Sequence, residues 1–353
     1  MGNDQKGDSK QLMKKVLIAS SAVILLLLIL LIIQQVVQML LVALAGLLLA
    51  VFLNGIAKPF RSKTKLPQAL SVTIVVFGLV LLLVVSVWIM GPHIAEQFSS
   101  LTERVPTALE NIEGGLQESK WGRDLLSRLP EVKEKIPFES EFIWGITGVF
   151  STALGTITSL LVILFIGLYC AADPDLYINN FIKMIPKEKR KRAREVITAM
   201  GNALRMWLLA RVASMVVVGI LTAAGLSIIG IQLALTLGII AALLSFVPFI
   251  GPPLGAIPAL LVALAESPIL AVYVLITYMI VQTLESYIIT PLIFSTTLSL
   301  PPAFLITIQV VMGVLFGAMG IAMASPLTVA IVVLVQMIYI QDILKDDVRV
   351  MGQ

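Results

Sequence analysis

The chain has 353 residues, of which 58% are apolar and only 13% are charged. Soluble domains carry about 25% charged residues, so this composition excludes an ordinary soluble enzyme and a disordered chain. The formal net charge of +4 gives no reason to expect a nucleic-acid partner, and the single cysteine, Cys170, excludes an internal disulfide framework. The composition therefore predicts an all-α polytopic membrane protein, with the lipid bilayer as its surroundings.

The first two apolar runs cover residues 16–33 and 36–53. A single helix through both runs would be about 57 Å long, because each residue adds about 1.5 Å. The hydrocarbon core of a bilayer is only about 30 Å thick. We therefore predict two separate spans, with a turn near Gln34 and Gln35.

Six further apolar segments follow along the chain. The third predicted span ends at Gly91-Pro92, and the fourth ends at Asp173-Pro174. The segments cover residues 69–90, 147–172, 206–229, 233–265, 269–289 and 303–340. The sequence thus predicts about eight hydrophobic segments, of which 233–265 and 303–340 are too long for simple spans.

Charged residues between the segments predict the orientation. Residues 1–15 hold four lysines, residues 54–68 hold four basic residues and no acid, and residues 173–205 hold eight basic residues. Residues 92–146 instead hold ten acidic residues against six basic ones. Under the positive-inside rule, the three basic stretches lie on the cytoplasmic side and 92–146 lies outside. We expect a multi-pass protein with a cytoplasmic N-terminus.

These features divide the chain into five parts. Residues 1–91 form the N-terminal tail and the first three spans, and residues 92–146 form extracytoplasmic amphipathic helices, either interfacial or a ligand-binding cap. Residues 147–205 form the fourth span and a basic cytoplasmic helix that docks on anionic headgroups, or on a regulatory partner. Residues 206–340 form the transport core with broken helices, and 341–353 form a cytoplasmic tail.

The run 233–265 is interrupted by a cluster of helix breakers. Residues 248–258 hold four prolines, and two glycines lie among them. Each interior proline removes a backbone hydrogen bond, and broken backbone at membrane depth is tolerated where it is buried in protein or lines a cavity. Transporters place such breaks at substrate or ion sites. We therefore assign Pro248, Gly251 and Pro252 to a broken or re-entrant helix along the pathway. A packing kink is the alternative.

Few charged residues lie inside the predicted spans. Glu285 is late in the seventh segment, and an acid at membrane depth is a functional-site hypothesis by default. Gln282 lies three residues earlier on the same helix face, and Gln309 lies early in the last run. Glu285 either binds Na⁺ or a proton during transport, or forms an ion pair with Arg211 of the fifth span; the two roles are compatible.

Several enzyme classes lack their parts in this sequence. No phosphate-binding loop of the Walker type is present, and His93 is the single histidine. One histidine excludes a His-Glu-x-x-His zinc protease and leaves a serine-protease mechanism with one poorly placed base. We expect no enzyme activity and no cofactor beyond a coupling ion, Na⁺ or H⁺.

Motifs in the C-terminal half resemble the autoinducer-2 exporter family of bacterial membrane proteins, also called PerM-like. Residues 246–252, Phe-Val-Pro-Phe-Ile-Gly-Pro, resemble the family's Ile-Pro-Tyr-Ile-Gly-Pro signature. Residues 282–287 followed by Pro291 resemble its Gln-x-x-Glu element, and residues 316–327 resemble its Gly-x-x-Gly…Pro-Leu ending. The chain departs from the family at Arg211, where many members carry glutamine, and at Pro301, where many carry histidine.

The resemblance implies a transporter of the bacterial inner membrane. Members of the family are assigned export of the quorum-sensing signal autoinducer-2 or Na⁺(Li⁺)/H⁺ antiport, and the family also implies a homo-oligomer, a pentamer. We expect a secondary-active exporter of a small hydrophilic solute, coupled to an ion gradient. A Na⁺(Li⁺)/H⁺ antiporter of monovalent cations, a passive channel and a non-transporting membrane scaffold are the alternatives.

Overall fold

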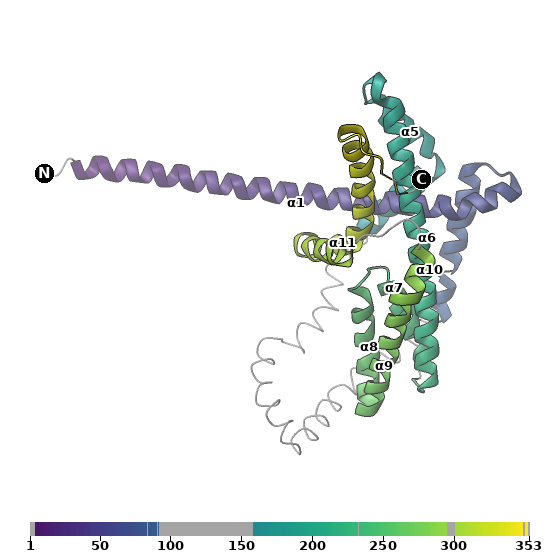
Figure 1. Cartoon of the computed structure of the whole chain (residues 1–353). Coiled ribbons are helices and arrows are strands. Elements are labelled where there is room, and N and C mark those ends of the chain that lie inside the picture. The colour runs from purple at the N-terminus through teal and green to yellow at the C-terminus, as the bar shows by residue number, and fades with distance from the viewer. Residues whose placement is uncertain are drawn as a thin grey trace, which may run out of the picture.

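The computed structural model describes residues 4–82, 84–89, 91, 158–231, 233–294, 301–348 and 350–351 (Figure 1). Every regular element among these residues is helical, which confirms the predicted all-α class. Five helices are long and apolar enough to cross a membrane, or six if the bent pair of the Thr158–Ala172 helix and α5 (Pro174–Lys183) is one span. The count of eight is therefore not confirmed in the described part of the chain. The predicted helices of 92–146 lie outside it.

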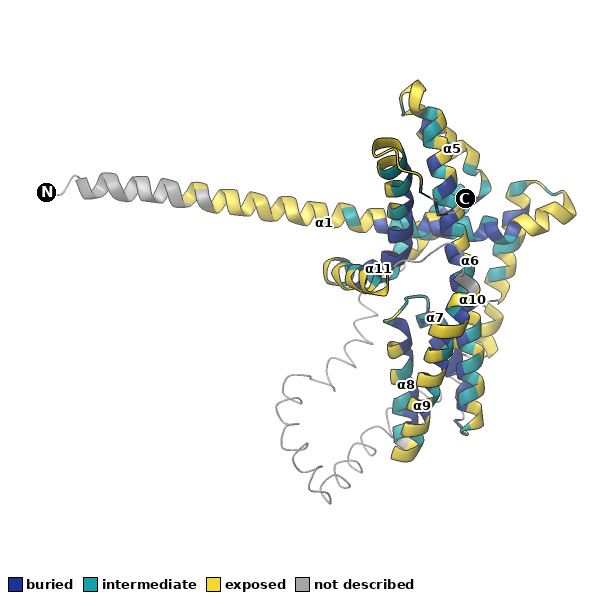
Figure 2. Ribbon diagram, viewed as in Figure 1, coloured by how far each residue is buried: buried dark blue, intermediate teal, exposed yellow. Residues whose placement is uncertain are grey.

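The predicted turn near Gln34 and Gln35 is wrong. Helix α1 (Asp4–Thr64) runs without interruption through both glutamines. The reason is local: neither glycine nor proline occurs at this point, and glutamine favours helix. The side-chain amide of Gln34 donates to the carbonyl oxygen of Leu315 at 3.2 Å, so it serves a contact between helices. Figure 2 shows that the described residues before this point are exposed, whereas those from Leu41 onward become partly buried.

The fourth predicted segment ends where the sequence indicates. The Thr158–Ala172 helix and α5 meet at Asp173-Pro174 with a bend of 90°. The carboxylate of Asp173 accepts a hydrogen bond from the backbone N–H of Leu176 at 3.0 Å, and Pro174 occupies the first helical position. An aspartate cap followed by proline starts a new helix in a new direction. The first part of this segment, 147–157, lies outside the described residues.

Helix α6 (Arg190–Ile228) lies at the centre of the described structure. It begins after a short 3₁₀ turn, η1 (Lys187–Lys189), and at 39 residues it is about 58 Å long. It contacts α1, α5 and α7 (Ala234–Leu244), and also α9 (Pro268–Leu284), α10 (Thr290–Phe294) and α11 (Pro302–Leu334). In Figure 1, α1 runs across the view and α6 runs from top to bottom. Helix α6 therefore connects the N-terminal and C-terminal parts.

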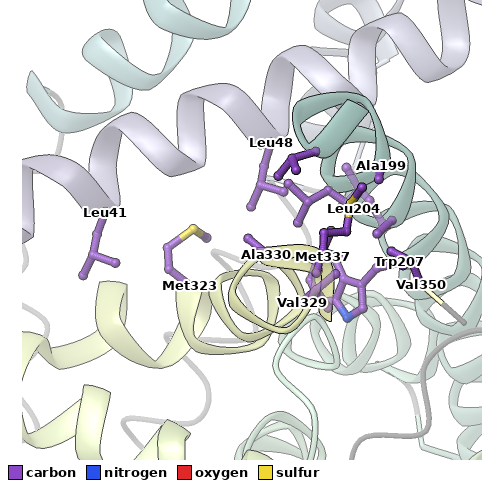
Figure 3. Close-up of a cluster of buried hydrophobic side chains, with 14 residues drawn as sticks. Leu41, Leu48, Ala199, Leu204, Trp207, Met323, Val329, Ala330, Met337 and Val350 are labelled. Atoms are coloured by element: carbon purple, nitrogen blue, oxygen red, sulfur yellow. The ribbon is translucent and has the colours of Figure 1, made fainter. Parts of the chain in front are cut away.

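Two apolar clusters hold these helices to α6. In the first, Trp207 and Leu204 of α6 pack against Val329 and Met337, with Leu48 of α1 beside them (Figure 3). The second joins the end of α6 to α7, α8 (Gly251–Glu266) and α9. Each cluster excludes water from apolar side chains of several helices, which stabilises their arrangement.

Both over-long C-terminal runs are broken, as predicted. The run 233–265 consists of α7 and α8, which are about 16 and 24 Å long and so are each shorter than a simple span. Helix α11 is broken at Gly317, where φ is +62°. A Cβ atom on Gly313 would lie 2.8 Å from Ile321, so the two halves of α11 fold back on one another. A π-helical segment, η3 (Val335–Ile343), follows.

Candidate transport site

The break between α7 and α8 covers residues 245–250. Phe249 has a φ of +64°, in the left-handed region that non-glycine residues rarely adopt. At Gly251, a Cβ atom would lie 1.8 Å from the carbonyl oxygen of Leu244. Only glycine allows the chain to approach so closely at this point. Ser245 at the start of the break and Gly251 and Pro252 at its end are buried, Pro248 is half-buried, and Phe249 is exposed, so the break is partly buried in the protein.

A buried ion pair lies beside this break. Nη1 of Arg211, on α6, lies 3.3 Å from Oε1 of Glu285, and each side chain is only 5% exposed. Ser214, almost one turn further along α6, donates its hydroxyl to the same Oε1 at 3.0 Å. The ion pair that the sequence offers as one role for Glu285 is therefore present, and α6 supplies both donors to the carboxylate.

Arg211 also connects the carboxylate to the break. Its Nε donates to the carbonyl oxygen of Phe246 at 3.1 Å. Phe246 lies within the irregular segment, so its carbonyl is not part of the hydrogen-bond pattern of a regular helix. Because the guanidinium is planar and presents donors on several edges, one side chain can bind the carboxylate and the broken backbone together. Arg211 therefore contacts both the carboxylate of Glu285 and the break.

The cluster has hydrogen-bonding capacity that the described residues leave unused. Nη2 of Arg211 and Oε2 of Glu285 are buried and have no hydrogen-bond partner there, and neither does the hydroxyl of Ser245 at the start of the break. An unsatisfied buried polar group costs about 1–3 kcal/mol, and more when it is charged. A functional role, a bound ion or a bound water molecule is among the explanations for such a group.

Glu285 begins a π-helical turn, η2 (Glu285–Ile289). The backbone N–H of Thr290 reaches back to the carbonyl of Glu285, five residues earlier. Pro291 follows, and it has no N–H to continue the α-helical pattern. Single π turns inside helices frequently mark functional sites. Gln282 is half-buried, and its amide donates to the hydroxyl of Ser286 at 3.4 Å rather than to Glu285.

Gln309 belongs to a different polar contact. It is fully buried on the first half of α11, and its amide nitrogen donates to the hydroxyl of Ser325 on the second half at 3.3 Å. Its Oε1 is buried without a partner among the described residues. Gln309 thus joins the two halves of α11 across Gly317. The structure brings together Arg211, Glu285 and the break, and it gives Gln309 a separate partner.

One residue of the site, Ser214, was not identified from the sequence. Ser214 belongs to no recognisable motif. Its spacing of three residues from Arg211, which places both residues on one face of α6, is the feature that could have identified it. The hydroxyl of Tyr278, on α9, donates to the carbonyl of Gly255 at 3.0 Å, which ties α9 to α8 just beyond the break.

Comparison with known proteins identifies the family. Residues 21–340 match the sequence profile described as AI-2E family transporter. Two Bacillus subtilis relatives, each named "Putative transport protein", are 25% identical: YueF over 295 residues, which is 80% of this chain and 79% of YueF, and YrrI over 251 residues, which is 69% and 70%. The match covers most of the chain and includes both broken runs and the Arg211–Glu285 pair. This multi-pass membrane protein therefore belongs to the AI-2E transporter family.

Proposed function

We propose that this protein is a secondary-active exporter of a small hydrophilic solute such as autoinducer-2, and that Glu285 carries the coupling ion, H⁺ or Na⁺. The observation that supports this proposal best is the buried Arg211–Glu285 pair, held 3.3 Å apart at the junction of a π turn and a broken helix. The carboxylate has one oxygen without a partner among the described residues, which is the ligand that a proton or a small cation requires.

The contacts suggest how ion binding moves the protein. In the ionised state Glu285 attracts Arg211, and Arg211 holds the carbonyl of Phe246. Neutralising the carboxylate leaves the guanidinium as an uncompensated buried charge, which costs about 3–5 kcal/mol. Arg211 then relaxes, and the segment between α7 and α8 is released from α6. A gradient supplies about 2.3 kcal/mol per charge and 100 mV, which is of the same order.

Broken helices then form the moving part. Helices α7 and α8 are short and meet at residues 245–250, and α11 is hinged at Gly317. In transporters, one part of the protein moves against another around such discontinuous helices. The binding site thereby opens alternately to the two sides of the membrane. We place the protein in the bacterial inner membrane with its N-terminus in the cytoplasm, as the charge distribution favours, and as a homo-oligomer, as the family resemblance implies.

The proposal is tested with proteoliposomes that contain the full chain. Accumulation of autoinducer-2 is measured with an imposed pH gradient, an imposed Na⁺ gradient, or neither. Three proteins are compared: the unaltered chain, Glu285→Gln and Glu266→Gln. Glu266 is an exposed acid at the end of α8, so its substitution removes the same charge away from the site. We expect gradient-driven accumulation by the unaltered chain and by Glu266→Gln, and a loss of at least about tenfold in Glu285→Gln, because about 1.4 kcal/mol or more of coupling is removed.

The same assay separates the alternatives. A Na⁺(Li⁺)/H⁺ antiporter, which would use the same carboxylate, exchanges cations in the absence of any organic solute. A passive channel equilibrates the solute at a rate that no ion gradient changes. A scaffold produces no flux. Any of these three results would replace the proposal of coupled export, as would equal accumulation by Glu285→Gln and the unaltered chain.

A further inference from the structure

A second candidate site lies away from Glu285, beside the basic end of α1. An open pocket of about 440 Å³ is lined by the end of α1, the start of the Gln68–Ile89 helix, the bend at Pro174 and the first half of α6. Arg211, Ser214 and Glu285 do not line it. Its volume is within the range of about 300–1,000 Å³ that is typical of ligand sites.

The lining is apolar at one end and basic at the other. Along α1, the pocket is bordered first by Leu47 and Val51 and then by Lys58 and Arg61, a rise of about 21 Å from Leu47 to Arg61. Arg205 of α6 adds a third cation, and no carboxylate is among the lining residues. A free inorganic anion would use only the basic end. An amphiphile with an anionic head and an apolar chain fits both ends.

Arg205 is poised to bind an anion. Its Nε is buried and has no hydrogen-bond partner among the described residues. Across from it lies Gly55 of α1, where an added Cβ atom would be 3.8 Å from that Nε. Since glycine has no side chain, α1 approaches the guanidinium closely at this position. A planar guanidinium recognises phosphate oxygens with two parallel hydrogen bonds, which makes it the preferred ligand for this group.

The neighbouring polar groups are held in place. Nη1 of Arg61 donates to Oε1 of Gln68 at 2.7 Å. The amide nitrogen of Gln68 donates in turn to Asn54 at 3.2 Å and to the carbonyl of Ala171 at 3.1 Å. This network joins three helices around the basic end of the pocket. Within the described part of the chain, no carboxylate forms an ion pair with Arg205, Lys58 or Arg61. Their charges are therefore available to a ligand.

We propose that this pocket binds one anionic phospholipid, with its phosphate at Arg205 and Lys58 and part of an acyl chain against the apolar residues of α1 and α6. The shared chemistry is a phosphate ester, which a lipid headgroup or a soluble phosphate could supply. The apolar wall and the position at the basic ends of long apolar helices favour the lipid, because anionic headgroups gather at such sites. This inference is independent of the proposed transport reaction.

Native mass spectrometry of the purified full chain tests the proposal. Phosphatidylglycerol and phosphatidylcholine are titrated separately, and inorganic phosphate is added in large excess as a competitor. We expect phosphatidylglycerol to bind at least about tenfold more tightly, and Arg205→Gln and Lys58→Gln each to lower its affinity about tenfold, which is the effect of losing one charge-assisted hydrogen bond. Lys183→Gln is the matched control, since Lys183 is exposed and does not line the pocket.

Folding is checked separately from binding. Arg205→Lys keeps the charge but loses the two-pronged geometry, so it should bind the lipid with an intermediate affinity while its unfolding temperature stays unchanged. Three results would overturn the proposal: equal affinity for the two lipids, an equal loss of affinity in Lys183→Gln, or full displacement of the lipid by inorganic phosphate. The last result would identify a site for a soluble phosphate ester instead.

Discussion

Removing both charges of the Arg211–Glu285 pair should destabilise the protein much less than the sum of the two single removals. Each side chain is 5% exposed, so a single substitution leaves the other charge buried and uncompensated. We expect Arg211→Gln and Glu285→Gln each to lower the free energy of unfolding by about 3 kcal/mol, the lower end of the range for broken buried pairs. The double variant has two neutral amides at the same positions. It should lose much less than the sum of the two single losses.

The assay is a double-mutant cycle of unfolding free energies, measured by denaturant titration in mixed micelles. The expected coupling energy between the two positions is about 2 kcal/mol or more, since the residues are in direct contact. Glu266→Gln, at an exposed acid, should change stability by less than about 0.5 kcal/mol. Additive losses within about 0.5 kcal/mol would refute the reasoning, because two residues that form a buried pair cannot act independently.

Two further predictions concern the broken helices and the basic helix. Gly251→Ala should destabilise the fold by about 2 kcal/mol or more, because the added Cβ would lie 1.8 Å from the carbonyl oxygen of Leu244. Gly78→Ala is the control, since no atom lies within 4 Å of the added Cβ. It should leave the thermal unfolding temperature unchanged or raise it. Arg192→Ala should speed hydrogen exchange in η3, because Nη2 of Arg192 lies 2.9 Å from Asp342 and also donates to the carbonyl of Met337. Equal exchange rates in both proteins would show that this contact does not hold η3.

The sequence was sufficient where backbone chemistry decides the structure. Asp173-Pro174 ends one helix and begins another because aspartate caps and proline starts a helix. The run 233–265 breaks at residues 245–250, where Pro248 lies, and Gly317 breaks the last run, whereas Pro258 is accommodated inside α8. The predicted pairing of Arg211 and Glu285 followed from a general energetic cost. An unpaired charge at membrane depth is unfavourable, so two isolated charges there need partners.

Sequence reasoning failed where the outcome depends on tertiary contacts. The turn at Gln34 and Gln35 was inferred from bilayer thickness alone, but Gln34 contacts α11 and α1 continues. Gln309 was grouped with Glu285 because both are polar and lie in apolar runs. Its partner is Ser325, which becomes a neighbour through the fold at Gly317. Spacing along one helix could not give the distance between residues on different helices.

The most direct test of the central claim is to record proton movement during solute transport. The full chain is reconstituted in liposomes that contain a pH-sensitive dye, and a gradient of autoinducer-2 is applied with and without Na⁺. The account predicts that solute flux moves protons, or requires Na⁺, in the unaltered chain and in Glu266→Gln. In Glu285→Gln, the proton movement and the Na⁺ dependence should both be lost. Solute flux without either signature, or an unchanged signature in Glu285→Gln, would contradict the account.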